Sequence, residues 1–446
     1  MKIPRRSFVS GAAGFVAAGA FSRVIGSTSR VHARERGPFL GYGELQPDPA
    51  GLLELPKGFQ YRVFSREGEP LTGGGIVPSN HDGTAAFAAG AAGVWLVRNH
   101  EVEPEDVEED GKLPVTPIRG ATYDPDGTGG TTTLLVSHDR RLQRHQLSLA
   151  GTANNCAGGP TPWDTWLSCE ETDLILSKPH GYVFEVDPRK GGNPQPIVAM
   201  GRFEHEAVSF DRRGIAYLTE DASEPLGCFY RFVPECRLGG KGSLHAGGSL
   251  SAMAVSGVNS DLSVVQQPGT VLRVSWVPVP NVNPSAGDTP VREQAQAKGA
   301  TPIKKAEGTW LGLDGSSWFV SSYAGGPDAE DPEDITAAAH SGQIWRYEPR
   351  SETIELVTIF AVGSPYDGPD NITASPHGFA LACTDGEDDQ WLVGIGDEGG
   401  SFPFARNASS DVEFTGATFA PDGQTLFANI QEPGMTFAIW GPWRRG

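Results

Sequence analysis

The segment GYVFEVDP at residues 181–188 is the first of three similar segments in this chain. GCFYRFVP follows at 227–234 and GQIWRYEP at 342–349. Each begins with glycine, continues with about six residues rich in aromatic and β-branched types, and ends at a proline, which cannot donate to a strand ladder. The three segments therefore predict short β-strands of one repeated kind, and such repetition is a strong indicator of architecture.

A second unit also recurs, a turn with aspartate and glycine followed by a strand, at 210–218, 312–320 and 419–427. Short aromatic strands, tight turns and loose repetition predict an all-β chain folded as a β-propeller, whose loops converge at one end of a central channel. A double β-sandwich is the alternative for this pattern. We expect residues 281–300 and 325–334 to be surface loops inserted between strands.

The composition fits a large, acidic β protein. The 446 residues suffice for one large all-β domain or two ordinary domains, and 58 glycines and 35 prolines argue against long helices. A net charge of -20 argues against nucleic acid as a partner, because a phosphate backbone needs a basic surface. No apolar stretch reaches the roughly 18–20 residues that span a bilayer, so we expect no stable membrane anchor. We also expect a monomer.

The beginning of the chain has the pattern of an export signal. PRRSFV at residues 4–9 is a twin-arginine pattern, a weakly apolar run follows at 11–21, and VHA at 31–33 offers a cleavage site. A disordered basic tail is the alternative. We predict a twin-arginine signal peptide over residues 1–33, an N-terminal arm over 34–55 and a propeller over 56–446. The protein would then be periplasmic, cell-wall associated or extracellular.

The five cysteines give weaker information. An odd number leaves at least one thiol unpaired in a monomer. In an exported protein Cys228 could pair with Cys236, and Cys169 with Cys383, although sequence does not determine connectivity. Their spacing matches no zinc site, because the chain lacks a Cys-x-x-Cys motif.

The stretch GTANNCAGGPTPWDTWLSCEE at residues 151–171 carries the clearest chemical signal. Cys156 lies in a polar, small-residue turn and not in an apolar strand. Glu170 and Glu171 follow a strand-like run, and neighbouring strand residues point to opposite faces, so one of them can face inward. A thiolate near carboxylates indicates a metal site of mixed character.

Further acidic clusters stand at the ends of strand-like runs. They are NHE at 99–101, FEHE at 203–206, TED at 219–221, the region of Glu307, the turn with Asp370 and Asn371, and Glu413. Any single cluster is typical of a solvated loop or a turn. A propeller would bring the set together, and a bound cation would then offset the cost of burying several carboxylates. Oxygen-rich ligands favour Ca²⁺, and the thiolate favours a transition metal such as iron.

With these motifs in order, the chain resembles the PhoX alkaline phosphatase family over roughly residues 40–446. The resemblance depends on NHE at 99–101, GGTTTL at 129–134, NCAGGPTPWDTWLSCEE at 155–171, RFEHE at 202–206, AYLTEDA at 216–222, AEGTW at 306–310, DGPDNI at 367–372 and FTGATFAPDGQTLFANIQEPG at 414–434. No Gly-x-Ser-x-Gly elbow, Walker loop or dinucleotide-binding motif competes with it.

The resemblance implies a six-bladed propeller, export by the twin-arginine pathway and hydrolysis of small-molecule phosphate esters. It also implies two ferric ions with two or three calcium ions beside them. Transferred to this chain, the metal ligands would be Cys156, Glu170, Glu171, Glu206, Glu307 and Asp370. The residues expected to act on substrate would be Lys305, Asn99 and Arg140.

Two positions depart from the family pattern. Lys305 stands where the family has an arginine that grips phosphate, and lysine keeps the charge but loses the two-pronged donor geometry. Asp139 stands where the family has an asparagine before an arginine pair, here Arg140 and Arg141. A carboxylate at that place would repel phosphate. A diverged phosphodiesterase or esterase, and a metal-stabilised propeller that only binds, therefore remain alternatives to a phosphate monoesterase.

Overall fold

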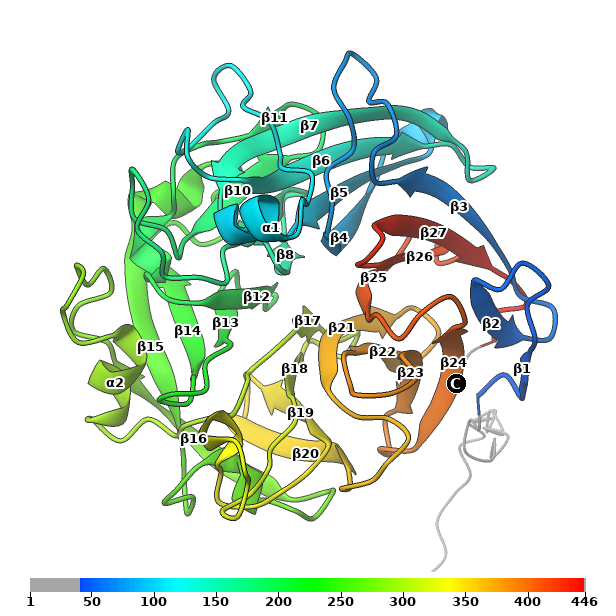
Figure 1. Cartoon of the computed structure of the whole chain (residues 1–446). Coiled ribbons are helices and arrows are strands. Elements are labelled where there is room, and N and C mark those ends of the chain that lie inside the picture. The colour runs from blue at the N-terminus through cyan, green and yellow to red at the C-terminus, as the bar shows by residue number, and fades with distance from the viewer. Residues whose placement is uncertain (1–40, 445–446) are drawn as a thin grey trace, which may run out of the picture. The chain divides into compact units, whose positions relative to one another are not determined.

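The structure is a computed structural model, and it describes residues 41–444. The predicted signal peptide at 1–33 lies outside the described residues. The described chain is all-β, with every pairing between named strands antiparallel. Figure 1 shows the sheets arranged around a common centre. This arrangement confirms the predicted all-β, propeller-like fold.

Hydrogen bonding divides the strands into five sheets. In two sheets, neighbouring strands are consecutive in the sequence. The first contains β4 (His81–Ala88), β5 (Val94–His100), β6 (Gly129–Val136) and β7 (Leu142–Thr152). The second contains β8 (Gly158–Pro160), β9 (Trp166–Cys169), β10 (Val183–Asp187) and β11 (Gly191–Gly192). The nine-stranded sheet contains β12 (His205–Phe210), β13 (Ala216–Glu220), β14 (Phe229–Pro234), β15 (Gly248–Val255), β16 (Val271–Pro278), β17 (Thr309–Leu311), β18 (Ser317–Ser321), β19 (Gly342–Glu348) and β20 (Thr353–Phe360).

The remaining two sheets combine both ends of the described chain. The six-stranded sheet contains β21 (Pro369–Ser375), β22 (Phe379–Thr384), β23 (Trp391–Gly396) and β24 (Ser401–Asn407), joined at its edge by β2 (Leu53–Pro56) and β1 (Leu45–Gln46). The last sheet contains β25 (Phe414–Phe419), β26 (Leu426–Ile430), β27 (Met435–Trp440) and β3 (Gln60–Arg66). Because β3 pairs with β27, an early strand completes a sheet made by the last three strands.

The repeats that predicted the fold occupy equivalent places. The three glycine-to-proline segments form β10, β14 and β19, each the third strand of its group, and the three turn-and-strand units lead into β13, β18 and β26. Aspartates make the turns: Asp211 accepts hydrogen bonds from the backbone N–H groups of Arg213 and Ile215, and Asp422 accepts one from Gln424. Such bonds from the backbone N–H groups to an aspartate side chain stabilise the turn conformation.

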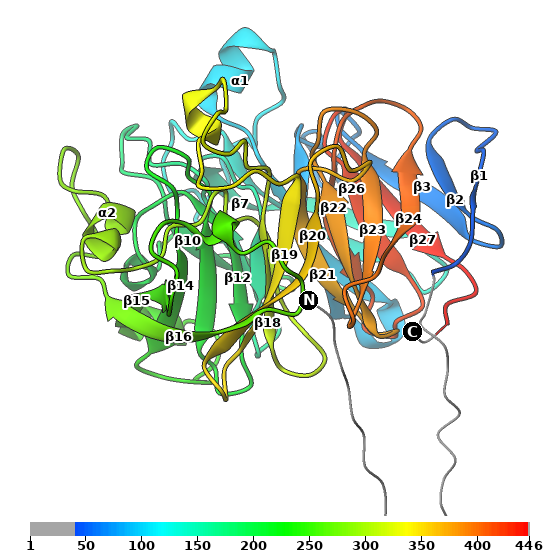
Figure 2. The same cartoon turned by 90° about the horizontal axis from the view of Figure 1, so that it is seen from below.

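Two local expectations need correction. Residues 281–300 are not only loop, because they contain the helix α2 (Val291–Gln296), whose Val291 and Ala295 are buried against the sheet. The boundary drawn between arm and propeller at 55/56 falls inside β2, whose Leu53 pairs with Asn407. The other helix, α1 (Pro104–Glu109), projects beyond one edge of the sheets in Figure 2. Within 41–444, no helix is long and apolar enough to cross a membrane.

The inward-facing strands β4, β8, β12, β17, β21 and β25 surround the centre in Figure 1 and approach one another closely. A cavity of about 20 Å³, room for about one water molecule, remains among their small residues. Gly83 donates its N–H to the carbonyl of Cys156 at 3.0 Å, and Gly308 donates to Asp370 at 3.1 Å. A Cβ at Gly83 would lie 2.5 Å from the Cα of Ala157. Glycine is therefore needed where one central strand touches the next.

We expect Gly83→Ala to lower the free energy of unfolding by about 1–3 kcal/mol, because the added methyl group meets backbone that cannot move aside. Urea denaturation of the variant and the parent protein measures the difference. Gly400→Ala is the matched control, since a Cβ at Gly400 meets nothing within 4 Å. Equal stability of the two variants would contradict this account of the central packing.

Candidate metal centre

The candidate site is formed where the inward-facing strands begin. Each of the six inward-facing strands has one potential metal ligand, either at its second residue or one or two residues before its start. These residues are Asp82 at β4, Cys156 before β8, Glu206 at β12, Glu307 before β17, Asp370 at β21 and Glu413 before β25. The arrangement of the six strands around one centre therefore directs five carboxyl groups and a thiol to the same end of the channel.

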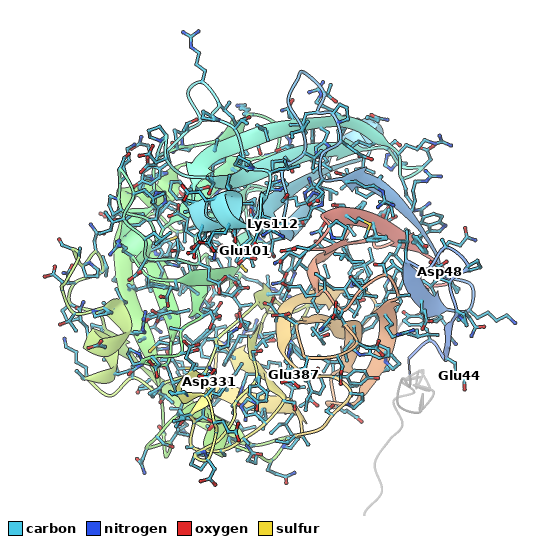
Figure 3. The ribbon with its side chains drawn as sticks, in the orientation of Figure 1. Glu44, Asp48, Glu101, Lys112, Asp331 and Glu387 are labelled. Carbon is cyan, nitrogen blue, oxygen red and sulfur yellow. The ribbon has the colours of Figure 1, made fainter. Side chains whose placement is uncertain are left out.

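The strand that follows each central strand runs back to the same edge. His205 pairs with Glu220, His81 with His100 and Pro369 with Thr384, so the next residues, Asp221, Glu101 and Asp385, also reach this edge. Glu171 occupies the equivalent place after β9. Figure 3 shows Glu101 close to α1, on the side toward the centre.

A local irregularity repeats at this edge. The pairing register shifts near the start of the central strand in four hairpins, between His81 and Thr84, His205 and Val208, Pro369 and Ile372, and Thr415 and Thr418. A bulge turns a side chain away from its normal alternation and is common beside functional sites. Here the shifted segments contain Asp82, Glu206 and Asp370, so the bulges direct these carboxylates into the centre.

Ligand atoms meet in four overlapping groups, in each of which three atoms lie within 4.8 Å of one another. The groups are Asp82 with Glu101 and Cys156; Cys156 with Glu171 and Glu206; Glu171 with Asp221 and Glu307; and Glu206 with Glu307 and Asp370. Shared members join the four groups into one continuous cluster, which we call the central acidic cluster.

Burial and mutual repulsion determine the electrostatics of the cluster. Desolvation, and then the charge of Asp370, raise the pKa of Glu206 well above its usual value. Desolvation, and then Asp385, raise the pKa of Asp370 to about 7. Burial, followed by the charges of Asp82 and Glu206, raises the pKa of the Cys156 thiol. All three shifts mean that negative charge is unfavourable here unless a cation is present.

The donor set fits bound cations. One oxygen each of Asp82, Glu206 and Glu413 is buried without a hydrogen-bond donor. Among the lysines and arginines of residues 41–444, Lys305 is the one that forms an ion pair with the cluster, with its Nζ 3.2 Å from Asp221 and 3.2 Å from Glu307. One ammonium group cannot balance this many carboxylates, whereas multivalent cations bound by oxygen and sulfur ligands would.

Five of the six predicted metal ligands lie in the cluster: Cys156, Glu171, Glu206, Glu307 and Asp370. Glu170 does not. Its Oε1 accepts hydrogen bonds from the Ala153 N–H and the His180 ring, and its Oε2 accepts them from the N–H groups of Gly181 and Tyr182. Glu170 therefore holds the turn before Cys156, and its neighbour Glu171 is the one that joins the cluster.

Asn99 and Arg140, two of the three residues predicted to act on substrate, lie outside the central acidic cluster. Asn99 is fully buried, donates to the carbonyls of Cys156 at 3.0 Å and Ala157 at 2.7 Å, and accepts bonds from Trp166 and Ser168. Both side-chain N–H donors of Asn99 therefore position the Cys156 turn, and its oxygen ties the side chain to β9.

Arg140 lies in the hairpin between β6 and β7, where its Nε donates to Thr425 and its guanidinium stacks over Trp440. Asp139 in the same hairpin is exposed and pairs with Arg141, so its charge does not bear on the cluster.

The disulfide pairings considered from sequence are wrong. All five cysteines are free thiols, four buried and Cys236 exposed. Sequence reasoning also left Asp82, Glu101 and Asp221 out of the ligand set. A usable signal exists in the printed sequence: a ligand followed by a small residue recurs as Asp82-Gly83, Cys156-Ala157, Glu206-Ala207 and Glu307-Gly308. The small residue is where the neighbouring strand approaches.

Comparison with known proteins identifies the family of the chain. The model of the family "Alkaline phosphatase PhoX" matches residues 40–434. The chain belongs to the PhoX family. No curated protein matches the sequence. Among solved structures, the chain is similar to Pseudomonas fluorescens PhoX in complex with vanadate, a transition state analogue, with 17% identity, coverage of 88% of this chain and 96% of that chain, and a TM-score of 0.67. A gluconolactonase from Xanthomonas campestris shares 9% identity over 90% of this chain and 99% of its own, with a TM-score of 0.46.

Membership in the PhoX family confirms the predicted class, a phosphoric ester hydrolase of the alkaline phosphatase type. The matched region covers every residue of the central acidic cluster. The match to the Pseudomonas fluorescens protein shows a shared fold.

We expect the metal-free PhoX-family protein to become less stable as pH rises from about 7.5 to about 9. Burial raises the folded-state pKa of Glu206, Glu307 and Glu413 above the unfolded values, so the folded state holds more protons and the free energy of unfolding falls as pH rises. The slope is about 1.4 kcal/mol per pH unit for each proton held only by the folded state. Buried histidines such as His81 have lowered pKa values, and above about pH 7.5 a histidine with its ordinary pKa near 6.5 is also neutral, so these histidines are neutral in both states in this range.

Urea denaturation of chelator-treated protein across this range measures the slope, and a parallel series with saturating Ca²⁺ should flatten it. Stability that stays constant or rises with pH in the chelated protein would show that the carboxylates are not held protonated in the fold.

Proposed function

We propose that this protein is an exported, metal-dependent phosphatase that hydrolyses small-molecule phosphate esters at the central acidic cluster. We propose two ferric ions and two or three calcium ions as its cofactors. The observation that supports the proposal best is the set of overlapping ligand groups, in which one thiol and many carboxylates meet around a single lysine.

The residues divide by chemical type. Cys156, with Glu171 and Glu206 beside it, would hold iron, because sulfur with oxygen ligands suits a transition metal. Glu307 and Asp370, with Asp221 near Glu307, would hold calcium through oxygen alone. Bound in this way, the cations would supply charge neutralisation and Lewis-acid activation of the phosphoryl group.

The protein's own groups prepare the site for an anionic substrate. Lys305, with 35% of its side chain exposed, lies at the open side of the cluster and can reach a phosphate oxygen. Asn99 holds the carbonyls of Cys156 and Ala157, which sets the direction of the thiol. Burial keeps that thiol protonated until a metal ion takes the place of its proton.

We propose that the propeller has six blades. The nine-stranded sheet would then consist of two blades, β12–β15 and β17–β20, joined through β16, which pairs with both β15 and β20. The six inward-facing strands, each carrying one potential ligand, support this division. We also propose twin-arginine export, on the motif PRRSFV at residues 4–9, to a periplasmic, cell-wall or extracellular location, where the protein acts as a monomer.

Glu307→Ala should reduce turnover of a chromogenic phosphate monoester by about 10³-fold or more, because two ligand groups lose a shared carboxylate. Initial rates of purified, metal-loaded protein measure this, with a phosphodiester assayed in parallel. Glu355→Ala, which removes a carboxylate paired with Arg346 at the outer strand β20, is the control and should keep its activity. No turnover of any ester above the Glu307→Ala background would favour a binding module.

Cys156→Ser should abolish iron binding and the thiolate-to-metal absorption band while calcium remains bound. Metal analysis and absorption spectra of protein matured in a native-like host check both. The exposed Cys236 provides the matched control, Cys236→Ser, which should keep the band. An unchanged spectrum in Cys156→Ser would remove this thiol from the ligand set.

A further inference from the structure

Lys304 and Lys305 are adjacent in the sequence, but their side chains differ in exposure and in binding partners. Lys304 is buried, with 2% of its side chain exposed, and its Nζ donates to the Oγ of Ser223 and the carbonyl of Glu333 and pairs with Asp334. Lys305 is 35% exposed, and its ion pairs are to Asp221 and Glu307. One ammonium group is therefore enclosed by fixed partners, while the other reaches into the central acidic cluster from its open side.

The backbone under both lysines is fixed. The Ser322 N–H donates to the carbonyl of Lys305 at 3.0 Å, and the Ser321 hydroxyl donates to that of Lys304 at 2.7 Å. Lys305 can therefore change its contacts only by rotating its own flexible side chain, and the exposed side gives that chain room to turn outward.

The carboxylates that bind Lys305 also belong to a cation-binding group. Asp221 and Glu307 lie with Glu171 in a set whose ligand atoms are within 4.8 Å of one another. The Lys305 ammonium lies 3.2 Å from two carboxylates of this group. A divalent ion bound by the same group would lie only a few ångströms from that ammonium, and two cations so close in a buried place repel each other strongly. The ion and the ammonium therefore compete for the same two carboxylates.

Two of the other three groups have no such competitor. The group of Asp82, Glu101 and Cys156 and the group of Cys156, Glu171 and Glu206 form no ion pair with a lysine or arginine among residues 41–444. The group of Glu206, Glu307 and Asp370 meets Lys305 through Glu307 alone, whereas Lys305 pairs with two members of the remaining group. The four positions should thus differ in affinity. The group of Glu171, Asp221 and Glu307, which we call the exchangeable group, should bind its ion most weakly.

We propose that the exchangeable group is a low-affinity divalent-cation site regulated by Lys305, whose ammonium occupies it until an ion displaces the side chain toward the open mouth. The displaced ammonium is then the group that faces phosphate. Binding of an ion to the exchangeable group therefore also frees Lys305 to bind the anionic substrate. The inference rests on the proposed metal centre but not on its catalytic activity.

Calcium titration of the chelator-treated protein by calorimetry tests the competition directly. Lys305→Met should tighten the weakest calcium-binding step by at least about tenfold, because the ion no longer has to displace an ammonium from two carboxylates. Lys112→Met is the matched control. It removes one cation, paired with Glu432, without touching the exchangeable group.

If Lys112→Met tightened the weakest calcium-binding step as much as Lys305→Met, the cause would be the net charge of the protein and not competition by Lys305. If Lys305→Met left the affinity of that step unchanged or lowered it, Lys305 would not compete with calcium. Either result overturns the proposal. Absence of ester turnover by the metal-loaded parent protein, with calcium binding as expected, would instead count against the proposed function alone.

A second measurement needs no variant. Acylation of surface amines, followed by peptide mass spectrometry, should label Lys305 several-fold faster when calcium is added to the wild-type protein, as the side chain leaves its carboxylates. Lys304 is the internal control and should stay protected with and without calcium. Labelling of Lys305 that calcium leaves unchanged or slows would contradict the displacement.

Discussion

The repulsion among buried carboxylates at one end of the channel is the constraint on which the rest of the structure depends. Glu206, Glu307 and Asp370 share one small region with Cys156, and burial with mutual repulsion raises the pKa of each of these groups. A fold that gathers such groups without cations would lose stability at neutral pH. The propeller framework must therefore be rigid enough to hold them, and the cluster has the ligand types and the excess of negative charge that suit bound cations.

That rigidity comes from the contacts between inward-facing strands. Gly83 against Cys156 and Gly308 against Asp370 connect neighbouring strands by backbone hydrogen bonds at the residues that carry the ligands. The support continues outward: Asn99 holds the Cys156 turn, and Glu170 with His180 holds the turn before it. Polar residues that do not reach the centre thus set the geometry of those that do, as is usual around metal sites.

Much of this was accessible from the printed sequence. The glycine-to-proline repeats predicted β10, β14 and β19, and acidic residues at strand ends predicted Glu206, Glu307 and Asp370 as a shared site. Asp82 was not included among the expected ligands, and Asn99 was assigned to substrate although it lies behind the cysteine. Both errors concern the direction of a side chain, which β-bulges and contacts with neighbouring sheets control.

Glu170 and Glu171 show where local information stops. Their residue types and alternation predict that one of the two faces inward, since adjacent residues of a strand point to opposite sides. Which one does so depends on distant segments: the N–H groups of Gly181 and Tyr182 and the ring of His180 surround Glu170, whereas Cys156, Glu206 and Glu307 surround Glu171. Strand periodicity and turn chemistry are properties of neighbouring residues and can be read in order along the chain. The partners that a carboxylate meets are brought from other strands by packing around the central channel, and no local pattern contains them.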